Sequence, residues 1–171
     1  MIIIKYIELF LIFLTSMYIG ILYSRGFSNR VRDLEEMKNA MSIFKSKIKF
    51  TYKTIPEVFE ELSKEIKNNI AGIFLLSKNY MKSYTASESW KIAMQESSST
   101  TNFNKEDIEI ISNLSKTLGD TDLEGQIAII ELTEKLIDRQ IQKAREEESK
   151  NGKLYKTLGM GMGITIIIIL V

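Results

Sequence analysis

The carboxylates of Asp120, Asp122 and Glu124 lie close together in the sequence and could in principle hold a hard cation through their oxygens. A calcium loop of the EF-hand type needs more ligands at fixed positions. Asp120 and Asp122 can instead accept hydrogen bonds from the free N–H groups at the start of a helix. Glu124 follows Thr121 by three residues, which is the spacing of a capping box. Helix capping explains this acidic corner more simply than metal binding does.

Other chemical motifs are missing from the sequence. It contains no Cys and no His, which removes disulfides, thiol and imidazole catalysis and the commonest transition-metal ligands. It has no phosphate-binding glycine loop, HExxH, CxxC or nucleophile elbow. The net charge of +1 gives no argument for a nucleic-acid partner. We therefore expect no enzymatic activity, cofactor, metal, small-molecule substrate or nucleic acid.

Two helices should meet at the acidic corner. The first is expected to end at Leu118, because Gly119 can enter the left-handed conformation without steric cost and is typical after a helix. The second should begin at Leu123, and its apolar face continues to Ala144 in steps of three and four. Its far end, from Gln140 to Lys150, is almost wholly charged or polar.

The chain before the corner predicts further amphipathic helices, and their apolar residues recur in steps of three and four from Val31 onwards. Residues 24–29 are expected to be a polar connection, and residues 97–102 a loop. Helix starts are indicated by capping boxes at Thr54-Ile-Pro-Glu57 and Thr85-Ala-Ser-Glu88, and by Asn104. Trp90 is expected to pack in the core of the all-α domain, a bundle of about six helices.

Both ends of the chain are apolar. Tyr6–Tyr23 and Leu154–Val171 each have 18 residues, which as helices span about 27 Å, close to the hydrocarbon thickness of a bilayer. The first could also be a cleaved signal peptide, but its apolar region is long and no A-x-A site follows it. Gly159 and Gly163 have the GxxxG spacing that lets two membrane helices approach closely. These segments predict transmembrane helices in residues 1–26 and 151–171, with a helical domain at residues 27–150 between them.

Basic residues near the spans indicate on which side of the membrane the domain lies. Lys5 is the one basic side chain on the outer flank of the first span, and none follows the second. The inner flanks carry Arg25, Arg30, Arg32, Arg145, Lys150, Lys153 and Lys156. This asymmetry predicts that the domain faces the cytoplasm.

Two sets of residues are candidates for binding a partner protein. One is the acidic corner with the following Gln126; the other is a basic edge that includes Lys45 and Lys49, together with Lys38. The simpler interpretation of the basic edge is a solvated helix face, and the alternative is a contact for an acidic partner or lipid headgroups. The simpler interpretation of the corner is capping alone.

The corner, Leu118-Gly119-x-x-Asp122 followed by Gln126, resembles the stage III sporulation protein AB family. The order of span, helical domain, corner and second span fits the same family over almost the whole chain. These are small membrane proteins of endospore-forming bacteria. Their soluble domain is similar to the helical cytoplasmic domain of the type II secretion F platform protein. This chain differs from that platform in having one helical domain and two spans, where the platform has a duplicated domain.

The resemblance implies a non-enzymatic scaffold in the secretion-like channel complex that links the mother cell to the forespore. Its place would be the mother-cell membrane around the forespore. Its partners would be other stage III sporulation proteins, including the AA-type ATPase that would dock on the cytoplasmic domain; a homo-oligomer is left open. The alternative is a two-span membrane sensor with an extracytoplasmic helical bundle. A sensor needs a signalling domain after the second span, and none follows in this sequence.

Overall fold

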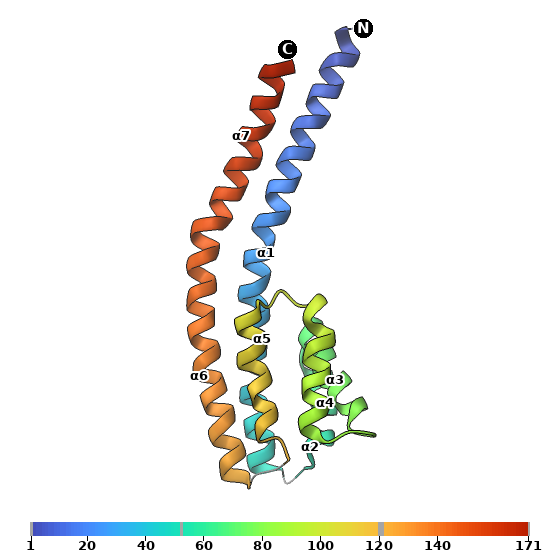
Figure 1. Ribbon diagram of the computed structural model, residues 1–171, viewed down its shortest axis with the longest axis vertical. Helices are drawn as coiled ribbons and strands as arrows, with labels where there is room; N and C mark the ends of the chain where they lie inside the picture. Colours follow the sequence, from blue (N-terminus) through green and yellow to red (C-terminus); the bar gives the residue numbers. More distant parts are fainter. Residues whose placement is uncertain (1, 52, 120–121, 171) are drawn as a thin grey trace. The chain divides into compact units, whose positions relative to one another are not determined.

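The computed structural model describes residues 2–51, 53–119 and 122–170, and the described chain is helical apart from its turns (Figure 1). It contains α1 (Ile2–Phe50), α2 (Ile55–Glu65), α3 (Asn68–Tyr80), α4 (Ala86–Glu96), α5 (Lys105–Ser112), α6 (Leu123–Glu147) and α7 (Lys153–Leu170). Short 3-10 turns occupy Ser97–Ser99 and Asn113–Lys116, and a π-helical turn occupies Glu148–Gly152. The chain divides into two compact units, Arg32–Gln142 and Met1–Val31 together with Lys143–Val171.

The unit Arg32–Gln142 is a bundle to which six helices contribute, α1 to α6, as the sequence predicts. Its centre is aromatic: the Phe59 ring lies 5.2 Å from the rings of both Phe44 and Phe74 and 5.6 Å from that of Trp90. Trp90 is fully buried and donates its indole N–H to the Ile111 carbonyl at 3.0 Å. The prediction that Trp90 is a core residue is therefore confirmed.

The predicted helix starts are found where the capping residues place them. The Thr54 N–H donates to Glu57 Oε2 at 2.8 Å at the start of α2. At the start of α4 the Glu88 N–H donates to Thr85 Oγ1 at 3.2 Å, and Thr85 N–H returns a bond to Glu88 Oε2 at 3.1 Å. Asn104 caps α5 by accepting the Asp107 N–H at 2.8 Å.

Two predicted boundaries are wrong. Residues 24–29 are not a connection, because α1 runs through them without a break. A glycine inside a helix costs about 1 kcal/mol relative to alanine. Near Gly26, Ser24 is buried and an ion pair of 2.6 Å joins Arg30 to Glu147. The helix before the corner does not reach Leu118 either: α5 ends at Ser112 and tightens into the 3-10 turn that follows.

Two stretches of the described chain, Ile4–Phe50 and Leu123–Leu170, contain helices long and apolar enough to cross a membrane. Little of their most apolar windows is buried, 17% and 11%. The core helix of a globular bundle buries far more of its apolar surface. Accordingly, large side chains such as Phe10, Tyr18 and Ile168 lie exposed.

Candidate functional site

Within the unit formed by the two ends of the chain, the first half of α1 packs against α7 through glycine. Gly159 is buried, and a Cβ placed on it would lie 2.9 Å from Gly20 Cα and 2.9 Å from the Ser16 carbonyl oxygen. A Cβ on Gly163 would meet the Phe13 ring at 2.9 Å. Because real Cβ atoms do not approach other atoms so closely, only glycine fits here, and the backbones are nearly in contact.

The residues of α1 in this contact were not singled out from the sequence. Ser16 donates its hydroxyl to the Gly159 carbonyl at 2.7 Å, and a Cβ on Gly20 would lie 2.7 Å from the Tyr155 carbonyl oxygen. Ser16 and Gly20 are four residues apart, which is the same small-xxx-small spacing as Gly159 and Gly163. That spacing in the first segment was the signal that would have identified them.

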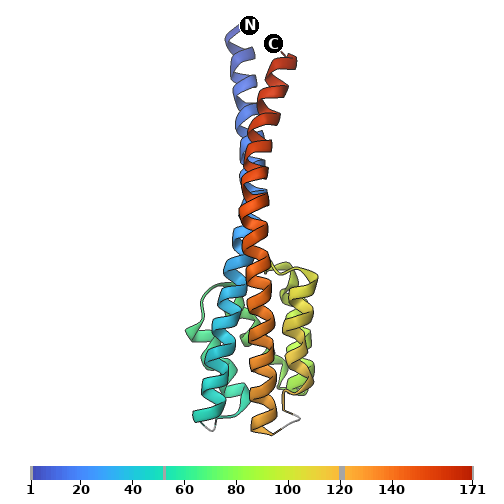
Figure 2. The same ribbon diagram turned by 90° about the vertical axis from the view of Figure 1, so that its left-hand side faces the viewer.

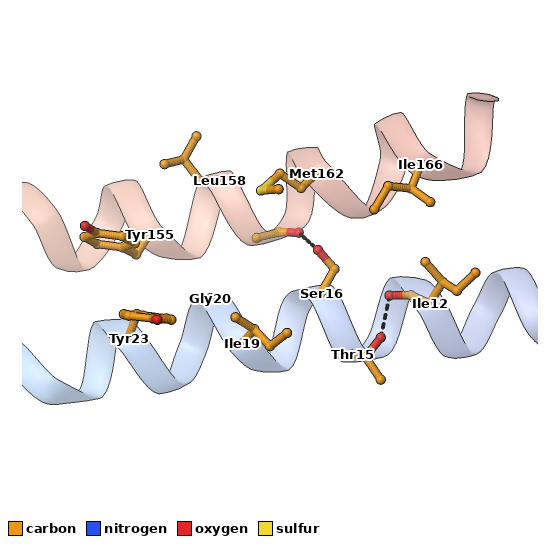
Figure 3. A pocket seen from close by; sticks show the side chains of 11 residues that line it. Ile12, Thr15, Ser16, Ile19, Gly20, Tyr23, Tyr155, Leu158, Met162 and Ile166 are labelled. Atoms are coloured by element: carbon orange, nitrogen blue, oxygen red, sulfur yellow. Dashed lines mark hydrogen bonds between the residues drawn. The ribbon is translucent and has the colours of Figure 1, made fainter. Parts of the chain in front are cut away.

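A groove of about 410 Å³ runs along one side of this helix pair (Figure 3). The stacked rings of Tyr23 and Tyr155, with centroids 5.7 Å apart, close one end of it, and Ile12 and Ile166 lie toward the other. The remaining lining is mostly aliphatic, including Ile19, Leu158 and Met162. No charged side chain of the described chain lines the groove, and its polar lining side chains are those of Thr15, Ser16, Tyr23 and Tyr155.

In the bundle unit, ion pairs join α1 to α6. Lys38 Nζ lies 2.6 Å from Asp138 Oδ1, and Lys45 Nζ lies 2.6 Å from Glu134 Oε2. Lys45 is also 3.7 Å from Glu131. The hydrogen bond to Glu134 raises the pKa of Lys45 above its ordinary value. Two lysines of the predicted basic edge, Lys38 and Lys45, therefore form ion pairs with carboxylates of α6, and their charge is largely compensated.

One residue of the acidic corner, Asp122, caps a helix. Asp122 Oδ1 accepts the Gly125 N–H at 2.9 Å at the start of α6, and the side chain is exposed. Gly119 has a φ of +85°, the left-handed conformation predicted for it. Glu124 is exposed and Gln126 is half-buried. Asp120 and Thr121, the latter in the predicted capping box, lie outside the described residues.

The two sets of candidate partner-binding residues meet at this end of the bundle. Two adjoining hollows of about 220 and 410 Å³ lie between the last turns of α1 and the first turns of α6. Lys49, Ile127 and Glu131 line both, Lys45 and Phe50 line one, and Leu123 and Glu124 line the other. We call this surface the α1–α6 groove. Among the described residues no group of three or more His, Cys, Asp or Glu side chains is placed to hold a metal.

Comparison with known proteins identifies the family. A family model described as Stage III sporulation protein AB matches residues 5–171. The chain belongs to the stage III sporulation protein AB family. Stage III sporulation protein AB of Bacillus subtilis (strain 168) is 20% identical over 153 residues, which cover 88% of this chain and 90% of the relative.

A solved structure titled Stage III sporulation protein AB (SpoIIIAB) has the same fold, with a TM-score of 0.66 at 16% identity. The match covers 70% of this chain and 96% of that chain. The family suggested by the corner, Leu118 to Gln126, is thus confirmed by the whole sequence and by the fold.

Proposed function

We propose that this protein is a membrane-anchored platform, without catalysis of its own, in the channel complex between the mother cell and the forespore. The observation that carries the proposal is the close packing of α1 and α7 through Gly20 and Gly159 in apolar segments whose outer surfaces are exposed. A hairpin of this kind is stable where lipid covers its apolar surface and its small residues bring the backbones together. Membership of the sporulation family supplies the biological setting.

Membrane anchoring is tested by extraction. Both apolar segments should be retained in the mature protein, so the chain should stay in the membrane fraction after washing with high salt or carbonate. Protease added to intact cells should leave the bundle uncut, because the basic flanks of the spans favour a cytoplasmic domain. A soluble form that lacks the first segment, or cleavage of the bundle from outside the cell, would contradict the proposal.

The docking role belongs to the bundle. We propose that the acidic corner receives the AA-type ATPase through Asp122, because this side chain is exposed at the start of α6 and uses one carboxylate oxygen for the cap. Within the part of the chain that the structure describes no cation pairs with Asp122, so its other oxygen and its negative charge are available to a basic partner.

Two substitutions at Asp122 separate capping from recognition. Asp122→Asn caps about as well as Asp but has no charge, and it should lose only about 0.3–1 kcal/mol of dipole interaction. Asp122→Ala removes both functions and should cost about 0.5–2 kcal/mol. We expect Asp122→Asn to fold like the wild type and yet to fail in binding the ATPase and in sporulation. If Asp122→Asn works and Asp122→Ala fails in step with lost stability, the corner is only a cap.

A further inference from the structure

The α1–α6 groove has one basic and one acidic wall. Lys49 is exposed on the α1 wall, and within the described residues no carboxylate pairs with it; its Nζ lies 5.4 Å from the Phe50 ring centroid. On the α6 wall, the Glu131 side chain is 51% exposed and reaches Lys45 only at 3.7 Å, because Glu134 holds that lysine at 2.6 Å. The charge of Lys49 and the exposed part of the Glu131 carboxylate, which shares Lys45 with Glu134, therefore face solvent in the groove.

The same surface carries apolar and small residues suited to helix packing. Phe50 is 69% exposed and Leu123 is 43% exposed. Ser42 and Ser46 on α1 and Ala128 on α6 are exposed and small, so another helix can approach closely. In Figures 1 and 2 the α1 and α6 segments of the bundle lie side by side, and the other helices of the bundle do not cover the face seen in Figure 2.

We propose that this groove is the contact between two copies of the chain. A face with one basic and one acidic wall is complementary to itself under a two-fold axis, which is the commonest symmetry of homo-oligomers. An axis that runs along the helices places α1 of each copy opposite α6 of the other. This axis is chosen because it sets the basic wall of each copy against the acidic wall of the other.

The helix register brings the opposite charges together. Lys45 is level with Glu131 and Glu134 of its own α6, so Lys49, one turn further along α1, is level with the turn that contains Ile127. A two-fold axis along the helices preserves height. Lys49 of one copy therefore faces the Ile127 turn of the other and reaches Glu131, one turn of about 5.4 Å away. The contact occurs twice in each dimer, and Phe50 of each copy packs on Ile127 of the other.

Charge exchange tests this arrangement in the full chain, reconstituted in lipid nanodiscs large enough for two copies, with the dimer fraction measured against protein concentration. Lys49→Glu and Glu131→Lys should each weaken dimerisation by about tenfold, because each places like charges opposite one another. The double variant restores opposite charges in both contacts and should dimerise like the wild type. Lys91→Glu, the same charge change at an exposed position on α4, is the matched control and should have no effect.

A second measurement is independent of charge. The chain has no native Cys, so a chain with Ser46→Cys and a differently tagged chain with Ala128→Cys should form a mixed disulfide, whereas Lys91→Cys with Ala128→Cys should not. A wild type that stays monomeric, single charge variants that dimerise normally, a double variant that is not restored, or the lack of the mixed disulfide would overturn the proposal. Carbonate extraction reports membrane anchoring separately, so failure of the dimer leaves that result unaffected.

Discussion

Replacing Gly159 by leucine should force α1 and α7 apart, because the contact leaves no room for a side chain. A Cβ at this position would lie 2.9 Å from both Gly20 Cα and the Ser16 carbonyl oxygen, and these are backbone atoms that cannot rotate away. Gly161 is the matched control on the same helix, since a Cβ there would have nothing within 4 Å. The two substitutions add the same side chain to α7 and differ only in the face that carries it.

The expected cost follows from overpacking. Forcing a side chain into a well-packed contact typically costs about 1–3 kcal/mol. Separation of the helices would also break the hydrogen bond from Ser16 to the Gly159 carbonyl, which is 2.7 Å long; bonds between membrane helices contribute about 0.6 kcal/mol on average. Together these terms, about 1.6–3.6 kcal/mol, lower the equilibrium constant for helix pairing by about 15- to 400-fold.

Thiol cross-linking measures this pairing in the membrane. Cysteines that replace Tyr23 and Tyr155, whose rings stack at 5.7 Å, should be joined efficiently within one chain by a short bifunctional reagent. Adding Gly159→Leu should strongly reduce the cross-linked fraction, and adding Gly161→Leu should leave it unchanged. Equal cross-linking in the two backgrounds would refute the packing argument, and so would a loss of cross-linking with Gly161→Leu alone.

Two further predictions concern the bundle. The fragment Phe27–Lys150 should be soluble and helical and should unfold cooperatively. In this fragment Trp90→Ala should lower the free energy of unfolding by about 3–5 kcal/mol. Trp90→Phe should lower it by about 1–3 kcal/mol, because the buried Ile111 carbonyl loses the indole N–H as its donor. Unchanged melting temperatures would contradict this. A hydrogen bond from Lys53, and to a smaller extent one from Lys47, lowers the pKa of Glu61 from 4.5 to about 2. The stability that these bonds provide is therefore present above pH 4.5 and is lost as the pH falls toward 2. Melting temperatures measured over a pH series should fall as the pH is lowered below 4.5, and this fall should be smaller in the Glu61→Gln variant.

The features that could be predicted from the sequence are the local ones. The caps at Thr54, Thr85 and Asn104 depend on side chains that lie three residues from their partners, so the sequence contains the whole interaction. The conformation of Gly119 is local in the same way. The apolar stripes and the two apolar ends likewise predict helices and their buried faces directly, because a helix repeats every 3.6 residues.

Contacts between distant segments could not be read from local patterns. Asp33 is buried and accepts both the Asn102 backbone N–H at 2.9 Å and its side-chain amide at 2.8 Å, which ties α1 to a loop 69 residues away. The sequence marks neither residue as special. Near Gly26, where α1 continues, Arg30 likewise pairs with Glu147 from the other end of the chain. Lys45 lies on the predicted basic edge, but its partner Glu134 becomes visible only when α1 and α6 are brought together.

The π-helical turn Glu148–Gly152 compensates for an irregular step in the spacing of buried residues in the last third of the chain. Buried residues occur at Ile130, Ile137 and Ala144, each seven residues after the last, and then at Gly152 and Gly159. The step from Ala144 to Gly152 is eight residues. A π turn holds one residue more than an α turn, so it absorbs the extra residue and the next seven-residue step starts in the same direction. Removing one residue from this turn should restore an uninterrupted series of seven-residue steps.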